Sequence, residues 1–379
     1  MKFIHMSDLH LGKRVNEYSM LEDQEYILKK ILGIIDREKP NGVIIAGDVY
    51  DKSVPSGEAV QLFDSFLTSI SAKGIEAFVI SGNHDSAERM SFGSALMEQS
   101  GIHISRVYNG VINPITRIDT YGNLNVYMLP FIKPANVRRF FEDEEIDSYT
   151  DAMRVAISQM DVNKEERNIL ITHQFVTGAS RSESEEISVG GTDNVDVSVF
   201  EDFDYVALGH IHGAQNCSSQ RVRYCGTPLK YSFSEASHNK SLTVVELLEK
   251  GEINISNIPL VPMRDMVEIK GEYCEVMKKS FYENTTYTED YVHITLTDEE
   301  DVTDAIGKLR TVYKNLMRLD YDNKRTRSTS VIEGDMAVDT KSPMELFEDF
   351  YELQNNQPMN ENQKALVSSL IEKIWEDEE

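Results

Sequence analysis

The chain has 379 residues, of which 40% are hydrophobic and 27% are charged, and its formal net charge is −26. This length allows two or three domains with cores of ordinary size. The acidic balance argues against a protein that coats nucleic acid by itself, because such proteins usually carry a basic stripe. Bound divalent cations, or a basic partner protein, would offset part of the charge.

The three cysteines include no C-x-x-C pair, so neither a disulfide framework nor a zinc knuckle is predicted. No apolar run reaches the roughly 18 residues that a membrane helix needs, and the chain enters a strand directly, without a signal-peptide segment. We therefore expect a cytoplasmic protein with no membrane association.

From residue 1 to about residue 258, short β-rich apolar runs alternate with helical stretches. Helices are predicted at 20–38 and 57–72, each with one apolar stripe. The stripes consist of Leu21, Ile27, Leu28, Ile31, Ile34 and Ile35, and of Val60, Phe63, Phe66, Leu67 and Ile70. This alternation predicts a layered α/β fold, in which ligands gather outside the carboxyl ends of the strands.

Five predicted strands are each followed by residues that can bind divalent metals. The strands are 3–6, 43–46, 77–80, 169–172 and 205–208, and the seven candidate ligands behind them are Asp8, His10, Asp48, Asn83, His173, His210 and His212. Asp8 and His10 are two residues apart, so an extended backbone turns both to one side. The repetition predicts one site where the strand ends meet.

The seven side chains provide ligands for two ions. Asp8 and His10, joined by His212, would hold the first ion, and Asp48 would bridge. Asn83, His173 and His210 would hold the second ion. Carboxylate, amide and imidazole ligands without thiolate suit Mn²⁺, with Fe²⁺, Zn²⁺ or Mg²⁺ as substitutes. Two such ions can activate water and neutralise charge at a phosphate.

The later part of the chain is predicted to contain further, separate segments. Residues 177–193 are predicted to form a mobile surface loop near the site. A hairpin at 242–247 and 253–255 closes the first domain, 1–258. A small α+β domain follows at 259–322, with strands at 266–269, 291–296 and 316–319 and helices at 275–282 and 302–313. Residues 323–341 are interpreted as a polar linker.

The C-terminal region, 342–379, is predicted to form two helices. Ser342-Pro343-Met344-Glu345 is a capping box that opens a helix burying Leu346, Phe347, Phe350 and Tyr351. The last helix carries one apolar face, formed by Leu366, Val367, Leu370, Ile371, Ile374 and Trp375. This face either docks on its own chain or lies in a groove of a partner.

The motifs resemble the signature of the calcineurin-like metallophosphoesterases, D-x-H, G-D, G-N-H-[DE], a histidine and G-H-x-H, in that order. Around the motifs the sequence is similar to the SbcD family, notably at residues 6–12, 47–51, 81–86, 205–212 and 224–228. The resemblance covers essentially the whole chain. It implies a four-layer α-β-β-α sandwich with a small α+β capping domain, which would bind DNA, and C-terminal helices.

The resemblance also implies a function. The family's enzymes are homodimeric, Mn²⁺-dependent nucleases that act as 3′ to 5′ exonucleases on duplex DNA and as endonucleases on single strands and hairpins. Their partner is SbcC, a coiled-coil ATPase, which would dock on the terminal helices. By resemblance His84 contacts the scissile phosphate and assists the leaving oxygen, and Asp85 orients His84. Asp51 stands where archaeal and eukaryotic relatives have a histidine.

Several residues keep two interpretations. The basic residues near the motifs, Lys13, Arg14, Lys52 and Arg89, either hold DNA phosphates or are solvated surface charges. His5, His103 and His293 lie in apolar strands and are predicted to be core or surface residues, while His238 is undecided. Two other functions also remain: a stand-alone phosphodiesterase for small nucleotides or phosphoproteins, and a scaffold that has lost its metals, which the intact ligand set disfavours.

Overall fold

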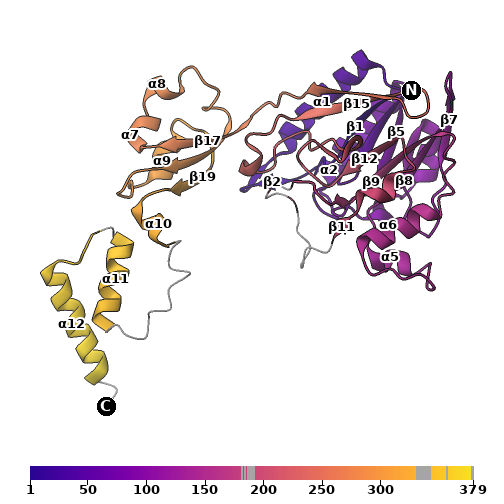
Figure 1. Cartoon of the computed structure of the whole chain (residues 1–379). Coiled ribbons are helices and arrows are strands. Elements are labelled where there is room, and N and C mark those ends of the chain that lie inside the picture. The colour runs from indigo at the N-terminus through magenta and orange to yellow at the C-terminus, as the bar shows by residue number, and fades with distance from the viewer. Residues whose placement is uncertain (181, 183–184, 186–192, 330–342, 356, 377–379) are drawn as a thin grey trace. The chain divides into compact units, whose positions relative to one another are not determined.

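The computed structural model describes residues 1–180, 182, 185, 193–329, 343–355 and 357–376. The chain divides into two compact units, Met1–Asp265 and Met266–Glu379 (Figure 1). The finer division into four segments that the sequence indicates stays a prediction. In the described part of the chain, no helix is both long and apolar enough to cross a membrane.

The first unit contains two six-stranded sheets. One has the strand order β16-β15-β1-β4-β5-β6. Its parallel strands are β1 (Lys2–Met6), β4 (Gly42–Ala46), β5 (Glu76–Ile80) and β6 (Ile102–Ile104). At one edge, β15 (Ser241–Leu247) and β16 (Ile253–Pro259) form the predicted antiparallel hairpin.

The other sheet has the order β13-β14-β12-β9-β8-β7. Its parallel strands are β14 (Ser219–Tyr224), β12 (Tyr205–Gly209), β9 (Arg167–His173) and β8 (Gly122–Leu129). The edge strands β13 (Gln215–Cys217) and β7 (Ile115–Asp119) are antiparallel. The shorter elements of this unit are β2 (Arg14–Val15), β3 (Tyr18–Ser19), α3 (Ala87–Met90), α4 (Ser94–Met97), β10 (Phe175–Val176) and β11 (Asn194–Val195).

The two sheets pack face to face. Apolar side chains from both sheets form one core between them, including Phe3, Ile44, Phe78, Val126, Ile169 and Ala207. Two polar contacts also cross this core: His5 Nδ1 lies 2.8 Å from the Tyr205 hydroxyl, and Arg223 Nε donates to Thr243 Oγ1 at 3.2 Å. His5 is therefore a bonded core histidine, as predicted.

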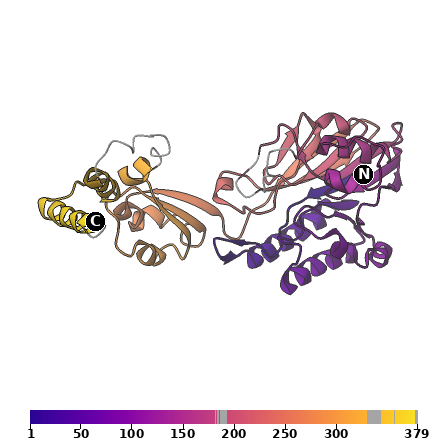
Figure 2. The same ribbon diagram turned by 90° about the horizontal axis from the view of Figure 1, so that it is seen from below.

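Helices form the two outer layers. The helices α1 (Leu21–Glu38) and α2 (Gly57–Ala72) cover the first sheet, and α5 (Pro134–Arg138) and α6 (Tyr149–Ser158) cover the second (Figure 2). This confirms the predicted α-β-β-α sandwich. One residue of the predicted stripe on α2 differs: Val60 is 44% exposed, while Ala59, Phe63, Phe66, Leu67 and Ile70 form the buried face.

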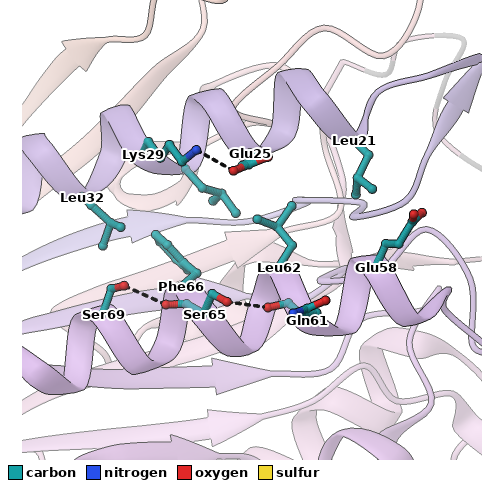
Figure 3. Close-up of a pocket in the computed structure, with 11 residues that line it drawn as sticks. Leu21, Glu25, Lys29, Leu32, Glu58, Gln61, Leu62, Ser65, Phe66 and Ser69 are labelled. Carbon is teal, nitrogen blue, oxygen red and sulfur yellow. Dashed lines mark hydrogen bonds and ion pairs between the residues drawn. The ribbon is translucent and has the colours of Figure 1, made fainter.

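A groove of 430 Å³ runs between α1 and α2 (Figure 3). Its floor is apolar, with Leu32, Leu62 and Phe66, and the polar side chains of Glu25 and Lys29 lie at its rim. The candidate metal ligands are not among its lining residues. The groove therefore belongs to the outer helical layer and is separate from the metal site.

The second unit contains a three-stranded parallel sheet of β17 (Met266–Gly271), β18 (Tyr291–Leu296) and β19 (Asn315–Tyr321). The predicted helix at 275–282 is wrong. It is two short helices, α7 (Tyr273–Val276) and α8 (Lys279–Tyr282), because the backbone of Lys278 is extended, with ψ of 132°. The helix predicted at 302–313 is shorter, α9 (Ala305–Arg310).

The C-terminal helices differ partly from expectation. The helix α10 (Lys324–Thr329) occupies the start of the predicted linker. The next two, α11 (Pro343–Asn355) and α12 (Glu361–Glu376), are joined by a hydrogen bond from Gln363 Nε2 to the Tyr351 hydroxyl at 2.7 Å. Phe347 and Phe350, predicted to be buried, are 40% and 58% exposed. The capping residue Ser342 lies outside the described residues.

Candidate metal centre

The candidate ligands gather where five strands end, those of β1, β4, β5, β9 and β12. Four of them have left-handed backbones, with φ of 53° at Asp8, 44° at His10, 48° at Asp48 and 102° at His210. Such angles are costly for residues other than glycine and concentrate at functional sites. The strain indicates that the fold, not local preference, dictates where these side chains point.

Two motif glycines allow the strand ends to approach one another. A Cβ atom on Gly209 would lie 1.8 Å from the carbonyl oxygen of Ala46 and 2.6 Å from His173 Nδ1. A Cβ atom on Gly82 would lie 2.1 Å from Asp48 Oδ1. Any side chain at either position would push the ligands apart.

One group of ligands consists of Asp8, His10 and His212, whose ligand atoms lie within 4.8 Å of one another. The two imidazoles face each other, with 3.2 Å between His10 Nε2 and His212 Nε2. Nδ1 of His212 lies 3.1 Å from the Glu235 carboxylate, which accepts a hydrogen bond. Nδ1 therefore carries the proton, and Nε2 of His212 presents a lone pair.

A second group surrounds Asn83. Its Oδ1 lies 3.0 Å from His173 Nε2 and 3.0 Å from His210 Nδ1. His173 Nδ1 lies 2.8 Å from the carbonyl oxygen of Ala46, which only accepts, so Nε2 of His173 presents a lone pair to the amide oxygen.

Asp48 joins the two groups. Its Oδ2 lies 3.3 Å from His173 Nε2 and 3.8 Å from His10 Nε2. Neighbouring ligands of one ion that bind at about 2.1 Å lie roughly 3 Å apart. The converging lone pairs at these separations fit two divalent cations that share Asp48, so the structure brings all seven predicted ligands together.

The site is electrostatically suited to cations. Burial and the nearby Asp48 raise the pKa of Asp8 to about 6. Burial alone would raise the pKa of Asp48 too, but His173 and His10 hold it well below its usual range. Burial opposes the charge on His173, yet Asp48 and Asp8 raise its pKa to about 9. The carboxylates thus draw positive charge into a buried site.

His84 lies beside Asp48, with 3.9 Å between its Nε2 and Asp48 Oδ2. Its Nδ1 lies 3.0 Å from the carbonyl oxygen of Asp51, so Nδ1 donates and Nε2 faces the centre. Asp85 accepts hydrogen bonds from the backbone amides of Gly82, Val49 and Tyr50 at 2.9–3.1 Å. Asp85 therefore holds the turn that supplies the Asp51 carbonyl, and its predicted role toward His84 stays a prediction.

The sequence did not reveal the residues that support His212. Glu235 is fully buried and pairs with Lys240 at 2.5 Å. Burial would raise the pKa of Glu235, but His212 and Lys240 lower it. Lys240 Nζ also donates to the His212 carbonyl at 3.0 Å. Glu235 stands outside every motif and no spacing signals it.

Other supporting residues hold the loop that carries His10. Gln24 Nε2 donates to the His10 carbonyl at 2.8 Å, and the Tyr231 hydroxyl donates to the Leu9 carbonyl at 2.5 Å. Glu185 accepts from the backbone amide of His212 at 2.6 Å. Glu185 belongs to the predicted mobile loop, much of which lies outside the described residues.

The four basic candidates occupy different surroundings. Lys13 Nζ pairs with Asp51 Oδ1 at 2.9 Å and lies over the ring of Tyr231. Arg89 Nη1 donates to the Ser53 carbonyl at 3.0 Å. Arg14 and Lys52 are exposed. Their roles as DNA contacts stay predictions.

The other histidines also have defined places. His103 Nε2 lies 3.1 Å from Glu76, and His293 lies between Glu268 and Asp320 at 3.2 and 2.8 Å. Both are largely buried with polar partners, as predicted. His238 is half-buried, with its ring against Gly213.

Comparison with known proteins identifies the family. Residues 1–214, more than half of the chain, match the family model of the calcineurin-like phosphoesterases. Residues 262–355 match a model described as the type 5 capsule protein repressor C-terminal domain, SbcD_C. The chain belongs to the SbcD family. As an SbcD-family member it is a hydrolase of the metallophosphoesterase type with a dinuclear metal centre.

Two SbcD relatives align over the whole chain. The SbcD component of the SbcCD nuclease of Staphylococcus epidermidis is 30% identical, with 100% of both chains covered. That of Staphylococcus saprophyticus is 31% identical, with coverage of 100% of this chain and 99% of the relative. A dimetal phosphatase from Danio rerio, among solved structures, overlays with a TM-score of 0.42 and 12% identity, covering 69% of this chain and 96% of that one.

Proposed function

We propose that the chain is the Mn²⁺-dependent nuclease component of an SbcC–SbcD type complex. It would act as a 3′ to 5′ exonuclease on duplex DNA and as an endonuclease on single strands and hairpins, in DNA repair, recombination and replication in the cytoplasm. The observation that carries the proposal is the convergence of seven side chains around Asp48, in a chain whose full-length relatives are named nucleases.

The ligand geometry suggests how each residue acts. Asp8, His10 and His212 would hold one Mn²⁺ and Asn83, His173 and His210 the other, with Asp48 shared. When bound, two such ions supply a hydroxide near neutral pH and neutralise charge on the phosphate. His84 Nε2 faces the same space and would donate a proton to the leaving oxygen, while the Asp51 carbonyl holds Nδ1.

The C-terminal helices would bind the coiled-coil ATPase. Their described apolar side chains are solvent-exposed, with Phe350 at 58%, Leu366 at 60% and Leu370 at 49%. Exposed apolar faces on amphipathic helices are typical of segments that lie in a partner's groove. This exposure favours partner binding over docking of these residues on the chain itself.

A homodimer would use an apolar surface in the first unit. Val54, Phe92, Leu96 and Met97 are 65%, 84%, 75% and 38% exposed. Val54, Phe92 and Met97 line one hollow of 390 Å³ together with Val60. An exposed apolar surface of this kind marks an interaction site, and its occupation by a second copy would also account for the exposure of Val60.

The test compares substrates. The purified protein with Mn²⁺ is offered duplex DNA, hairpin DNA and cyclic nucleotides in parallel reactions. We expect cleavage of DNA. Hydrolysis of the cyclic nucleotides alone would instead establish the stand-alone phosphodiesterase, the alternative that the same metal centre could serve.

A further inference from the structure

Two phenylalanines border the ligand group of Asn83 and have no part in the chemistry assigned above. The ring centroid of Phe131 lies 6.3 Å from that of His173, and the ring centroid of Phe175 lies 6.5 Å from that of His210. Both rings meet the imidazoles edge to face, and both side chains are only half-buried. Part of each ring therefore remains accessible next to the metal centre.

The backbone that carries Phe131 is fixed on both sides. Its amide donates to the Ser81 carbonyl at 2.9 Å, beside the end of β5. The carbonyl of Ile132 accepts from Gln174 Nε2 at 3.0 Å, beside the end of β9. The segment after β8 is thus tied to the two strand ends that supply Asn83 and His173, so the ring position is set by the same framework as the ligands.

Phe175 is held in a similar way. The Tyr224 hydroxyl accepts from the Val176 amide at 2.8 Å and donates to the Gln174 carbonyl at 2.6 Å, so it bridges the residues on either side of Phe175. A rigid aromatic side chain beside a reactive centre costs little conformational entropy when it binds a flat group.

A cation accompanies the first ring. Lys133 is exposed, and its Nζ lies 6.0 Å from the ring centroid of Phe131. Proteins that bind unpaired nucleic acid combine aromatic rings, on which bases stack, with basic side chains along the phosphates. The three residues provide both kinds of group at one edge of the site.

We propose that Phe131 and Phe175 stack unpaired nucleobases next to the cleaved phosphodiester, and that Lys133 holds a phosphate of the same strand. The inference rests on the proposed nuclease function and narrows its substrate class. In a continuous duplex, both faces of each base are covered by neighbouring bases. The residues thus favour strands whose bases are unpaired at the cleaved position, such as single strands, hairpin loops and frayed ends.

The test uses the whole protein with Mn²⁺ and two single-stranded oligonucleotides, one with normal bases and one with abasic sites around the cleaved bond. Phe131→Ala should raise KM for the normal strand on the order of tenfold, the loss expected for one stacked base. KM for the abasic strand and the Kd for Mn²⁺ should stay unchanged. Phe131→Trp should retain the wild-type preference.

Phe140→Ala is the matched control, because Phe140 is 46% exposed and its ring lies against Tyr108. Should Phe131→Ala fail to fold, Phe131→Leu removes the aromatic face with less loss of volume. Equal changes on both strands, or a parallel change in the Kd for Mn²⁺, would show that Phe131 only supports His173 and would overturn the inference. If the wild type cleaves neither strand, the nuclease proposal fails as well.

Discussion

The Nδ1 atom of His212 lies 3.1 Å from Oε1 of Glu235, a carboxylate that is itself buried against Lys240. This contact fixes the tautomer of the imidazole and turns its Nε2 toward His10. Partners of this kind, one bond removed from the metal, typically contribute tenfold to a hundredfold to metal affinity. Glu235 is thus a positioning residue for the centre.

The first prediction concerns this contact. Glu235→Gln keeps the shape of the side chain but removes the charge that strengthens the hydrogen bond from His212. We expect Mn²⁺ affinity to fall about tenfold, measured by isothermal titration calorimetry. Glu249→Gln, at an exposed position, serves as the control. An unchanged affinity in Glu235→Gln would contradict the positioning role.

The second prediction concerns Asp48, which lies within ligand distance of both groups. Asp48→Ala should abolish binding of both ions and cleavage together, because one carboxylate serves both positions. Metal content after Mn²⁺ saturation and DNA cleavage are the two measurements. A variant that still holds two ions per chain would show that Asp48 does not bridge them.

The third prediction separates His84 from the ligands. His84→Ala should retain both ions, while the cleavage rate falls on the order of 10²- to 10⁴-fold, as expected for loss of a general acid. Single-turnover kinetics and metal analysis on the same sample test this. Loss of metal in the variant would instead assign His84 to the coordination of the ions.

The fourth prediction concerns stability and pH at the edge of the sandwich. Asp119 bonds the buried Arg167 and the N-terminal amine, the latter at 2.9 Å. Burial would raise the pKa of Asp119, but these two cations lower it below its usual value of 3.8. The carboxylate therefore stabilises the fold at neutral pH, and this contribution is lost as the pH falls below about 4.

Asp119→Asn should lower the free energy of unfolding by about 2 kcal/mol at pH 7. The difference from the wild type should shrink in acid, since the wild-type carboxylate is then protonated. Urea unfolding at pH 7 and at lower pH values measures both effects, with Asp147→Asn as the exposed control. A difference that grows in acid would contradict the assigned sign.

The fifth prediction concerns the C-terminal helices. Deletion of residues 342–379 should leave Mn²⁺-dependent DNA cleavage intact while association with the SbcC-type ATPase is lost. The double variant Phe350→Ala and Leu366→Ala should weaken association in the same direction, because both side chains are exposed apolar residues. Co-purification measures the association, and its retention after the deletion would refute this docking surface.

The sequence was sufficient for the framework of the site. Helix α1 begins at Leu21 and α2 spans Gly57–Ala72, as their apolar stripes indicated, and the five motif strands end where expected. Periodicity identifies an apolar face but not what covers it, so Val60 and Phe350 were wrongly assigned to buried faces. It also cannot show a single extended residue such as Lys278, which divides α7 from α8.

The supporting residues were beyond the sequence for a different reason. Gln24 and Glu235 reach the metal ligands through tertiary contacts, from a helix and a short turn whose own sequences carry no metal-binding pattern. Their buried polar atoms are explained only when the partner is seen in space. Motif spacing identified the ligands because it reflects strand ends, and it contains no information on what lies behind them.

The metal ligands come from two different sheets. Asp8, Asp48 and Asn83 follow strands of one sheet, and His173, His210 and His212 follow strands of the other. Bound cations would therefore cross-link the halves of the sandwich, and neither half alone offers a complete coordination sphere. The thermal midpoint should accordingly climb with free Mn²⁺ concentration, so that metal supply governs how long the folded enzyme persists as well as how fast it works.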